Sequence, residues 1–190
     1  EEGLRYFNLS QDKKTILLVG GSQGALGINK GVSAQLASFK DNDYQLIWQT
    51  GNHYYDKALS EVDENGLGDR IKCTVFIDRM DLAYAAADVV ISRAGAMSIS
   101  ELSLLNKAVV FVPLPTAAED HQTKNAMSLV NADAALLVKN SETENVLLPT
   151  VFDLLKNVDK QNEMKNNIAK FARPNAAEDI VDQIEIVLKK

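Results

Sequence analysis

The sequence has little of the chemistry that cross-links chains or holds metal ions. Among 190 residues there is a single cysteine, Cys73, and there are two histidines. One cysteine permits no intramolecular disulfide and no cysteine-based metal cluster, and this usage fits a reducing, cytoplasmic setting. The two histidines, His53 and His121, lie far apart in the chain and make a poor zinc site.

Long apolar runs and a basic surplus are also missing. No apolar run approaches the ~20 residues of a membrane-spanning helix, and no signal peptide opens the chain. The net charge is −6, from 20 Lys and Arg against 26 Asp and Glu. This balance argues against nucleic acid or an anionic membrane as the main partner, because both attract basic surfaces. The chain also lacks an initiator Met, which we interpret as the mark of a processed product or a piece of something longer.

What is present is material for a buried core, since 46% of the residues are hydrophobic. Short apolar, β-branched segments alternate with helical stretches along the chain. Strands apolar on both faces are typical of a parallel sheet covered by helices on each side. We therefore predict a Rossmann-like, doubly wound α/β domain over residues 1–190. The predicted strands are 15–19, 44–49, 71–76, 89–92, 108–112 and 135–138.

Residues 142–190 show helical periodicity and no further strand. Arg173-Pro174 interrupts this segment, and a terminal helix is predicted over 175–190. Ile180, Ile184, Val187 and Leu188 place one apolar stripe on that helix. The stripe packs either on the sheet of this chain or on another domain, and the sequence leaves both open.

Ligands of open α/β sheets bind beyond the carboxyl ends of the strands, so the turns after the strands are the places to search. The first turn, residues 20–25, reads Gly-Gly-Ser-Gln-Gly-Ala. Its glycines let the backbone approach a ligand, and the helix that follows offers unpaired N–H groups to a phosphate. Ser22 adds a hydroxyl donor. The turn is neither a dinucleotide fingerprint nor a P-loop, which argues against a dehydrogenase and a nucleoside triphosphatase; a plain strand-to-helix turn is the alternative.

The fourth turn, residues 92–101, carries a second set of polar groups. Gly95 allows another close backbone approach, and Arg93 is placed to face a diphosphate. Glu101 is placed to accept hydrogen bonds from both hydroxyls of a ribose. Ser98-x-x-Glu101 also fits a capping box, so the residues alone leave Glu101 as either a ribose ligand or a helix cap.

The fifth turn combines a rigid exit with a polar helix start. Pro113 and Pro115 follow the buried strand, and His121, Gln122 and Asn125 are side chains of the kind that read sugar hydroxyls. A capped, solvated helix end is the competing interpretation. After the third strand, residues 76–80 offer backbone amides to a flat base.

Other chemical motifs are rejected. Asp41-Asn42-Asp43 has the D-x-D spacing of metal-dependent sugar transferases, but it precedes the second strand and so lies at the wrong end of the sheet. A surface turn is the better interpretation. No Gly-x-Ser-x-Gly nucleophile elbow is present. We therefore expect no metal and no other cofactor.

Four of these segments occur together in one order and spacing. They are the turn 20–25, Phe76-Ile77-Asp78-x-Met80, Ser92-Arg93-x-Gly95-Ala96 through Glu101, and Val112-Pro113 through His121-Gln122 to Asn125-Ala126. The set resembles the C-terminal half of the MurG family over essentially the whole chain. These bacterial transferases add N-acetylglucosamine to the lipid-linked muramoyl-pentapeptide precursor of peptidoglycan, converting lipid I to lipid II.

The resemblance implies one half of a GT-B glycosyltransferase, whose C-terminal domain binds UDP-N-acetylglucosamine. His121 and Gln122 fall where the family has two adjacent glutamines that hold the sugar, so His121 departs from the pattern. The resemblance also raises the ribose role of Glu101 above the cap. The implied contacts are Ser22 with the amides around Gln23 and Gly24 on the diphosphate, Ile77 on uracil, Ala96, Met97 and Ser98 on nucleotide and phosphate, and Glu101 on ribose.

The acceptor site, the attacking base and a membrane-facing patch belong to the N-terminal half of the family, and this chain carries none of their motifs. The resemblance therefore implies a chain that binds donor with little turnover by itself. Its implied partners are an N-terminal domain and, through it, the lipid-linked acceptor at the cytoplasmic face of the membrane. Two alternatives are a non-catalytic UDP-sugar-binding subunit that works with a partner chain, and a fragment of a sugar-nucleotide epimerase of the same architecture.

Overall fold

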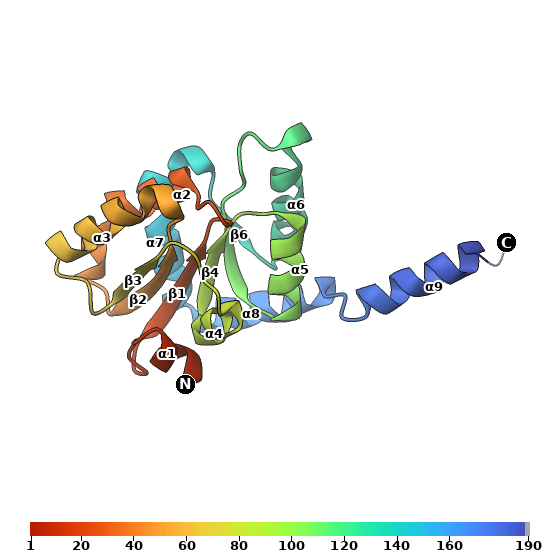
Figure 1. Cartoon of the computed structure of the whole chain (residues 1–190), viewed down its shortest axis with the longest axis horizontal. Coiled ribbons are helices and arrows are strands. Elements are labelled where there is room, and N and C mark those ends of the chain that lie inside the picture. Colours follow the sequence, from red (N-terminus) through yellow and green to blue (C-terminus); the bar gives the residue numbers. More distant parts are fainter. Residues whose placement is uncertain (189–190) are drawn as a thin grey trace.

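The computed structural model describes residues 1–188, built around a six-stranded sheet with helices on both faces (Figure 1). The strand order is β3-β2-β1-β4-β5-β6, and all neighbouring pairs are parallel, which confirms the predicted doubly wound fold. The strands are β1 (Lys14–Val19), β2 (Tyr44–Gln49), β3 (Ile71–Thr74), β4 (Val89–Ser92), β5 (Ala108–Phe111) and β6 (Leu136–Leu137). The α-helices are α1 (Glu2–Tyr6), α2 (Leu26–Ala34), α3 (Tyr55–Glu64), α4 (Met80–Ala86), α5 (Ala96–Leu104), α6 (His121–Val130), α7 (Thr143–Lys156), α8 (Val158–Ile168) and α9 (Ala176–Leu188).

The predicted strands are confirmed in place, and they differ from the structure at their ends. The second and fourth have the predicted bounds, whereas β3 ends at Thr74 instead of residue 76. There the Thr74 hydroxyl donates to Phe76 O over 2.6 Å and turns the chain. The sixth strand shrinks to two residues, which pair with Val110 and Phe111 at the edge of the sheet.

Two apolar layers lie on opposite faces of the sheet. Ile16 and Leu18 of β1 join the cluster beneath α2, α3 and α7, while Leu17 between them joins the cluster beneath α4, α5 and α6. All three side chains are fully buried. Because successive side chains of a strand point to opposite faces, a strand buried on both sides is apolar throughout. This explains why the continuous apolar segments of the sequence marked the strands.

A glycine lets α2 lie close against α7. A Cβ atom at Gly31 would lie 2.6 Å from Thr143 Cβ and 2.9 Å from Thr143 O. The Thr143 hydroxyl also donates to Gly27 O over 2.8 Å. Since Thr143 opens α7, these contacts fix the connection after β6 beside the first turns of α2.

Gly31→Ala is expected to lower the free energy of unfolding by about 1–2 kcal/mol. Forcing a methyl into a packed contact costs about 1–3 kcal/mol, and the better helix propensity of alanine offsets up to about 1 kcal/mol of it. Urea unfolding measures the difference. Gly68→Ala is the matched control, because the nearest atom to its Cβ would be Asp63 Oδ1 at an ordinary 3.6 Å. Equal stability of the two variants would contradict the packing argument.

Helix α9 extends away from the sheet (Figure 1). None of its residues is buried, and Ile180, Ile184 and Leu188 are 61%, 53% and 80% exposed. Of the two placements that the sequence left open, packing on the sheet of this chain is therefore wrong. Residues 189–190, which close the predicted helix, lie outside the described residues.

Candidate functional site

A cleft of about 730 Å³ lies beyond the carboxyl ends of the strands. It is lined by turns that follow β1 (Gly20, Gly21), β4 (Gly95), β5 (Leu114) and β6 (Ser141). The strand order reverses between β1 and β4, since the chain crosses from β3 at one edge back to β4 beside β1. Such a switch point opens a crevice between the two turns, which is where ligands of this architecture bind.

The turn after β1 is held by the turn after β2, backbone against backbone. Gly24 has a φ of +75°, and a Cβ atom there would lie 2.0 Å from Thr50 O. Gly51 has a φ of +73°, and its Cβ would lie 2.1 Å from Gln23 O. Gln49 Nε2 also donates to Gly21 O over 2.8 Å. The first turn is therefore a braced platform whose shape requires glycine at both contact points.

At the turns that follow β1, β4 and β5, three helices begin without a side-chain cap. They are α2, α5 and α6, whose N-cap residues Ala25, Gly95 and Asp120 make no capping hydrogen bond. A side-chain cap is also missing at α1, α3, α4 and α7, so these three starts are distinguished by their place at the cleft and not by being uncapped. Unpaired N–H groups at a helix start carry a partial positive charge. The cleft is thus suited to a polyanion such as a diphosphate.

The capping-box interpretation of Ser98 and Glu101 is wrong. Helix α5 begins at Ala96 after the extended Gly95, so Ser98 already lies inside the first turn. The Glu101 carboxylate instead accepts a hydrogen bond from the Tyr84 hydroxyl, at 3.0 Å from Oε2. The extended backbone of Gly95 starts the helix two residues before Ser98, which removes the donors that a cap at Ser98 would serve. Glu101 is exposed and remains a candidate ligand.

Arg93 lines the cleft, but part of its guanidinium is already bound. Its Nη1 donates to Val112 O over 2.9 Å and to Pro113 O over 3.0 Å. Burial lowers the pKa of this guanidinium from its ordinary value. Arg93 therefore ties the turn after β4 to the turn after β5, and its contact with a diphosphate stays a prediction.

The turn after β5 presents one amide to the cleft. Gln122 Oε1 accepts a hydrogen bond from Leu114 N over 3.0 Å, and its Nε2 has no hydrogen-bond partner within residues 1–188. His121 lies 2.8 Å from Ala118 O through Nδ1 and is exposed. Asp120 has a left-handed backbone with a φ of +53° and does not cap α6, so the capped-end interpretation of this segment is wrong.

The structure brings only some of the predicted site residues into the cleft. Gly24, Arg93, Ser98 and Gln122 line it. Ile77 lies elsewhere, in a hollow of about 200 Å³ that it shares with Phe76 and Cys73. Burial, together with the charges of Asp63 and Glu61, raises the pKa of the Cys73 thiol to about 12. The other predicted residues are exposed outside the cleft lining: Ser22, Gln23, Ala96, Met97, Glu101 and His121.

The sequence reasoning missed the wall that follows β6. Asn140, Ser141, Thr143 and Glu144 line the cleft together with Lys30 of α2. The signal was available, because the rule that ligands bind after strand ends applies to the sixth strand as to the others. Strand β6 is only two residues long, so its end was the least defined.

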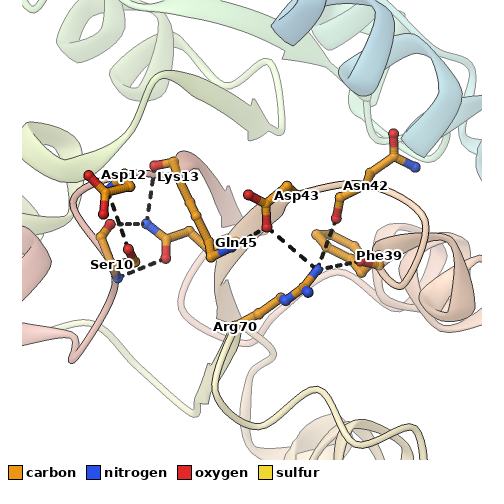
Figure 2. A network of polar contacts seen from close by, with 8 residues as sticks. All are labelled: Ser10, Asp12, Lys13, Phe39, Asn42, Asp43, Gln45 and Arg70. Atoms are coloured by element: carbon orange, nitrogen blue, oxygen red, sulfur yellow. Dashed lines mark hydrogen bonds and ion pairs between the residues drawn. The ribbon is translucent and has the colours of Figure 1, made fainter.

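The rejected D-x-D segment lies at the amino ends of the strands, opposite the cleft; its polar contacts are drawn in Figure 2. Asp43 forms an ion pair with Lys13 and lies 4.0 Å from Arg70 Nη1. Arg70 also donates to Phe39 O and Asn42 O. Lys13 precedes β1, Asp43 precedes β2 and Arg70 precedes β3. The predicted location at the wrong end of the sheet is therefore confirmed. The segment joins loops, away from the cleft.

The described residues hold neither a metal-binding cluster nor a membrane-spanning helix. Within residues 1–188, no three His, Cys, Asp or Glu side chains gather as a metal site would require. In the same residues no helix combines the length and apolar character needed to cross a bilayer.

Comparison with known proteins gives consistent results. Residues 15–180 match the family described as "Glycosyltransferase family 28 C-terminal domain". A protein of Christiangramia forsetii is 48% identical over 185 residues, which are 97% of this chain and 49% of that protein. One of Parabacteroides distasonis is 47% identical over 190 residues, 100% of this chain and 51% of that protein. Both are named "UDP-N-acetylglucosamine--N-acetylmuramyl-(pentapeptide) pyrophosphoryl-undecaprenol N-acetylglucosamine transferase".

A solved structure agrees with these relatives. The crystal structure of MurG from Acinetobacter baumannii superposes with a TM-score of 0.81 at 31% identity, covering 96% of this chain and 52% of that one. The chain thus spans about half the length of the relatives that it matches.

Proposed function

Because this chain belongs to the family of glycosyltransferase family 28 C-terminal domains, we propose that it binds UDP-N-acetylglucosamine as a sugar donor. Its fold is one half of the GT-B architecture, as the resemblance implied. One observation carries the proposal: three uncapped helix starts converge on the cleft at the switch point of the sheet. A nucleoside diphosphate sugar supplies the charge that such a site attracts.

The diphosphate is assigned to the starts of α2 and α5. Ser22 is exposed, and its hydroxyl has no hydrogen-bond partner within residues 1–188, so it is free to donate. The amides around Gln23 and Gly24 and the first turn of α5, with Ala96, Met97 and Ser98, complete the contacts. Gly95 supports this placement, because open space lies where its Cβ would be.

The remaining parts of the donor extend from the diphosphate in two directions. The backbone of Ile77 is assigned to uracil and the carboxylate of Glu101 to the ribose hydroxyls. His121 and Gln122 are assigned to the N-acetylglucosamine. The free Nε2 of Gln122 supports its part, because an amide N–H₂ donates readily to a sugar hydroxyl.

In the whole protein we assign to this site the donor half of an inverting transfer. The acceptor's C4 hydroxyl, on the lipid-linked muramoyl-pentapeptide, attacks the anomeric carbon, and the bond to the UDP oxygen breaks. Negative charge grows on the departing diphosphate, and the preorganised helix starts stabilise it. This assignment needs no metal ion or other cofactor. The base that takes the acceptor's proton, and the contact with the cytoplasmic face of the membrane, are assigned to the part of the relatives that this chain does not span.

The two alternatives to this proposal are a fragment of a sugar-nucleotide epimerase and a non-catalytic UDP-sugar-binding subunit. The curated relatives at 47–48% identity bear the name of a transferase, which favours transfer over epimerisation. A non-catalytic subunit would bind the same donor. In that case the base would come from a separate partner chain and not from another part of the same protein.

A titration of the 190-residue chain with UDP, UDP-N-acetylglucosamine and NAD tests the proposal. We expect heat of binding from the two uridine ligands and none from NAD, because the turn after β1 lacks the dinucleotide fingerprint. A turnover assay with lipid acceptor is expected to show little or no transfer by this chain alone. Tight NAD binding without a response to UDP would refute the donor assignment, and appreciable transfer would refute the assignment of the base.

A further inference from the structure

Within residues 1–188, the one hydrogen bond of the Glu101 carboxylate joins two helices. The Tyr84 hydroxyl of α4 donates to Glu101 Oε2 of α5 over 3.0 Å, between residues 17 apart in the chain. The two ends of this bond differ in exposure. Tyr84 is only 8% exposed and belongs to the core cluster beneath α4, α5 and α6, whereas Glu101 is exposed. A rigid buried donor therefore holds a side chain that faces solvent.

The bond leaves Glu101 with spare acceptor capacity. An ionised carboxylate has about four lone-pair positions. Within residues 1–188 the Glu101 carboxylate accepts a hydrogen bond from Tyr84 alone, so Oε1 and part of Oε2 remain unused. Two neighbouring hydroxyls of one ligand match what is left. An untethered exposed glutamate would have to lose its rotamer freedom when it binds them, and this loss opposes binding.

Tyr84 is suited to hold the carboxylate across the ordinary pH range. Burial, and then the negative charge of Glu101, raise the pKa of the Tyr84 hydroxyl above its usual value. The phenol therefore stays protonated and acts as a donor. A buried hydroxyl with its acceptor in place is also costly to leave unpaired, which favours one orientation of the Glu101 side chain.

We propose that Tyr84 is a positioning residue for the ribose: it orients the Glu101 carboxylate so that the free oxygen meets the 2′ and 3′ hydroxyls of the bound nucleotide. This inference rests on the donor site proposed above. Tyr84 acts through Glu101 and makes no contact with the ligand. The structural alternative is that Tyr84 only packs α4 against α5.

Tyr84→Phe separates the two roles, because it removes the hydroxyl and keeps the buried ring. Calorimetric titrations use UDP and 2′,3′-dideoxyuridine 5′-diphosphate, which lacks both ribose hydroxyls. We expect Tyr84→Phe to weaken UDP binding about three- to tenfold, because an untethered Glu101 must give up rotamer freedom when it binds, at a cost of that order. Binding of the dideoxy nucleotide should stay unchanged, since it has no hydroxyl for Glu101 to meet.

Tyr54→Phe is the matched control. Tyr54 is also buried, at 6% exposed, and its hydroxyl lies 2.9 Å from Ser33 Oγ, away from Glu101. This variant loses a hydrogen bond of similar length, and we expect it to bind UDP like the unmodified chain. Urea unfolding of both variants shows whether they remain folded.

The other outcomes each overturn the inference in a recognisable way. Equal weakening of both nucleotides by Tyr84→Phe would assign Tyr84 to packing alone, and unchanged UDP binding would remove its role altogether. If the unmodified chain binds both nucleotides equally, Glu101 does not read the ribose, although UDP binding itself stands. If the unmodified chain binds neither, the proposed function fails with the inference.

Discussion

Gly24→Ala is expected to lower the free energy of unfolding by about 2–5 kcal/mol, a larger loss than that of Gly31→Ala. The new Cβ would lie 2.0 Å from Thr50 O, which is backbone and has no rotamer to escape into. Overpacking of this kind costs about 1–3 kcal/mol, and a left-handed backbone adds about 1–2 kcal/mol for a residue with a side chain. Urea unfolding with a shared slope measures the loss.

The same substitution is expected to abolish detectable UDP binding, because the turn proposed to hold the diphosphate must shift. Gly95→Ala provides the contrast. Its Cβ would meet no atom within 4 Å and its φ is −70°, so the cost to stability is at most about 1 kcal/mol, that of alanine at an N-cap. It places a methyl in the cleft, so UDP affinity should fall more than stability. Wild-type stability in Gly24→Ala would show that the two turns do not brace each other.

Glu101→Ala is expected to weaken UDP binding about 10- to 100-fold. Hydrogen bonds to a charged group are worth about 1.5–3 kcal/mol, and each 1.4 kcal/mol is tenfold in affinity. Stability should fall by only about 1 kcal/mol, because the Tyr84 hydroxyl loses its acceptor. Calorimetry gives the affinity and urea unfolding the stability.

Glu144→Ala is the control for charge. Glu144 lines the cleft, unlike Glu101, and its removal takes away one negative charge from the region proposed for the diphosphate. Charge alone predicts stronger UDP binding in both variants, since a carboxylate repels a polyanion. The ribose role predicts opposite results for Glu101→Ala and Glu144→Ala. Parallel changes in the two variants would therefore dismiss Glu101 as the ribose ligand.

Much of the fold was predictable because it depends on short segments. A strand buried on both faces must be apolar along its length, as 44–49 and 89–92 are, and these two strands had the predicted bounds. Because all strands of a parallel sheet run in one direction, their carboxyl ends lie together. Asp43, which precedes β2, was therefore rightly assigned to the opposite end of the sheet. The glycine-rich turn after β1 was recognisable for the same local reason.

The site was less predictable wherever two partners compete for one side chain. Ser98 and Glu101 have capping-box spacing, yet Gly95 starts the helix earlier and Tyr84 takes the carboxylate. Arg93 was expected to face a ligand, and it binds two carbonyls of a neighbouring turn. Spacing along the chain does not indicate which of several possible partners the fold brings within hydrogen-bond distance.

The sequence by itself determined the strands, the glycine turns and the edge of the sheet at which a ligand would bind. These follow from burial and from backbone freedom, which each short segment carries in its own residues. Only the tertiary structure decided the partners of Arg93 and Glu101, the wall after β6, and the departure of α9 from the sheet. Those features depend on residues brought together from distant parts of the chain, where hydrogen-bond geometry and close packing select one arrangement among several that the sequence allows.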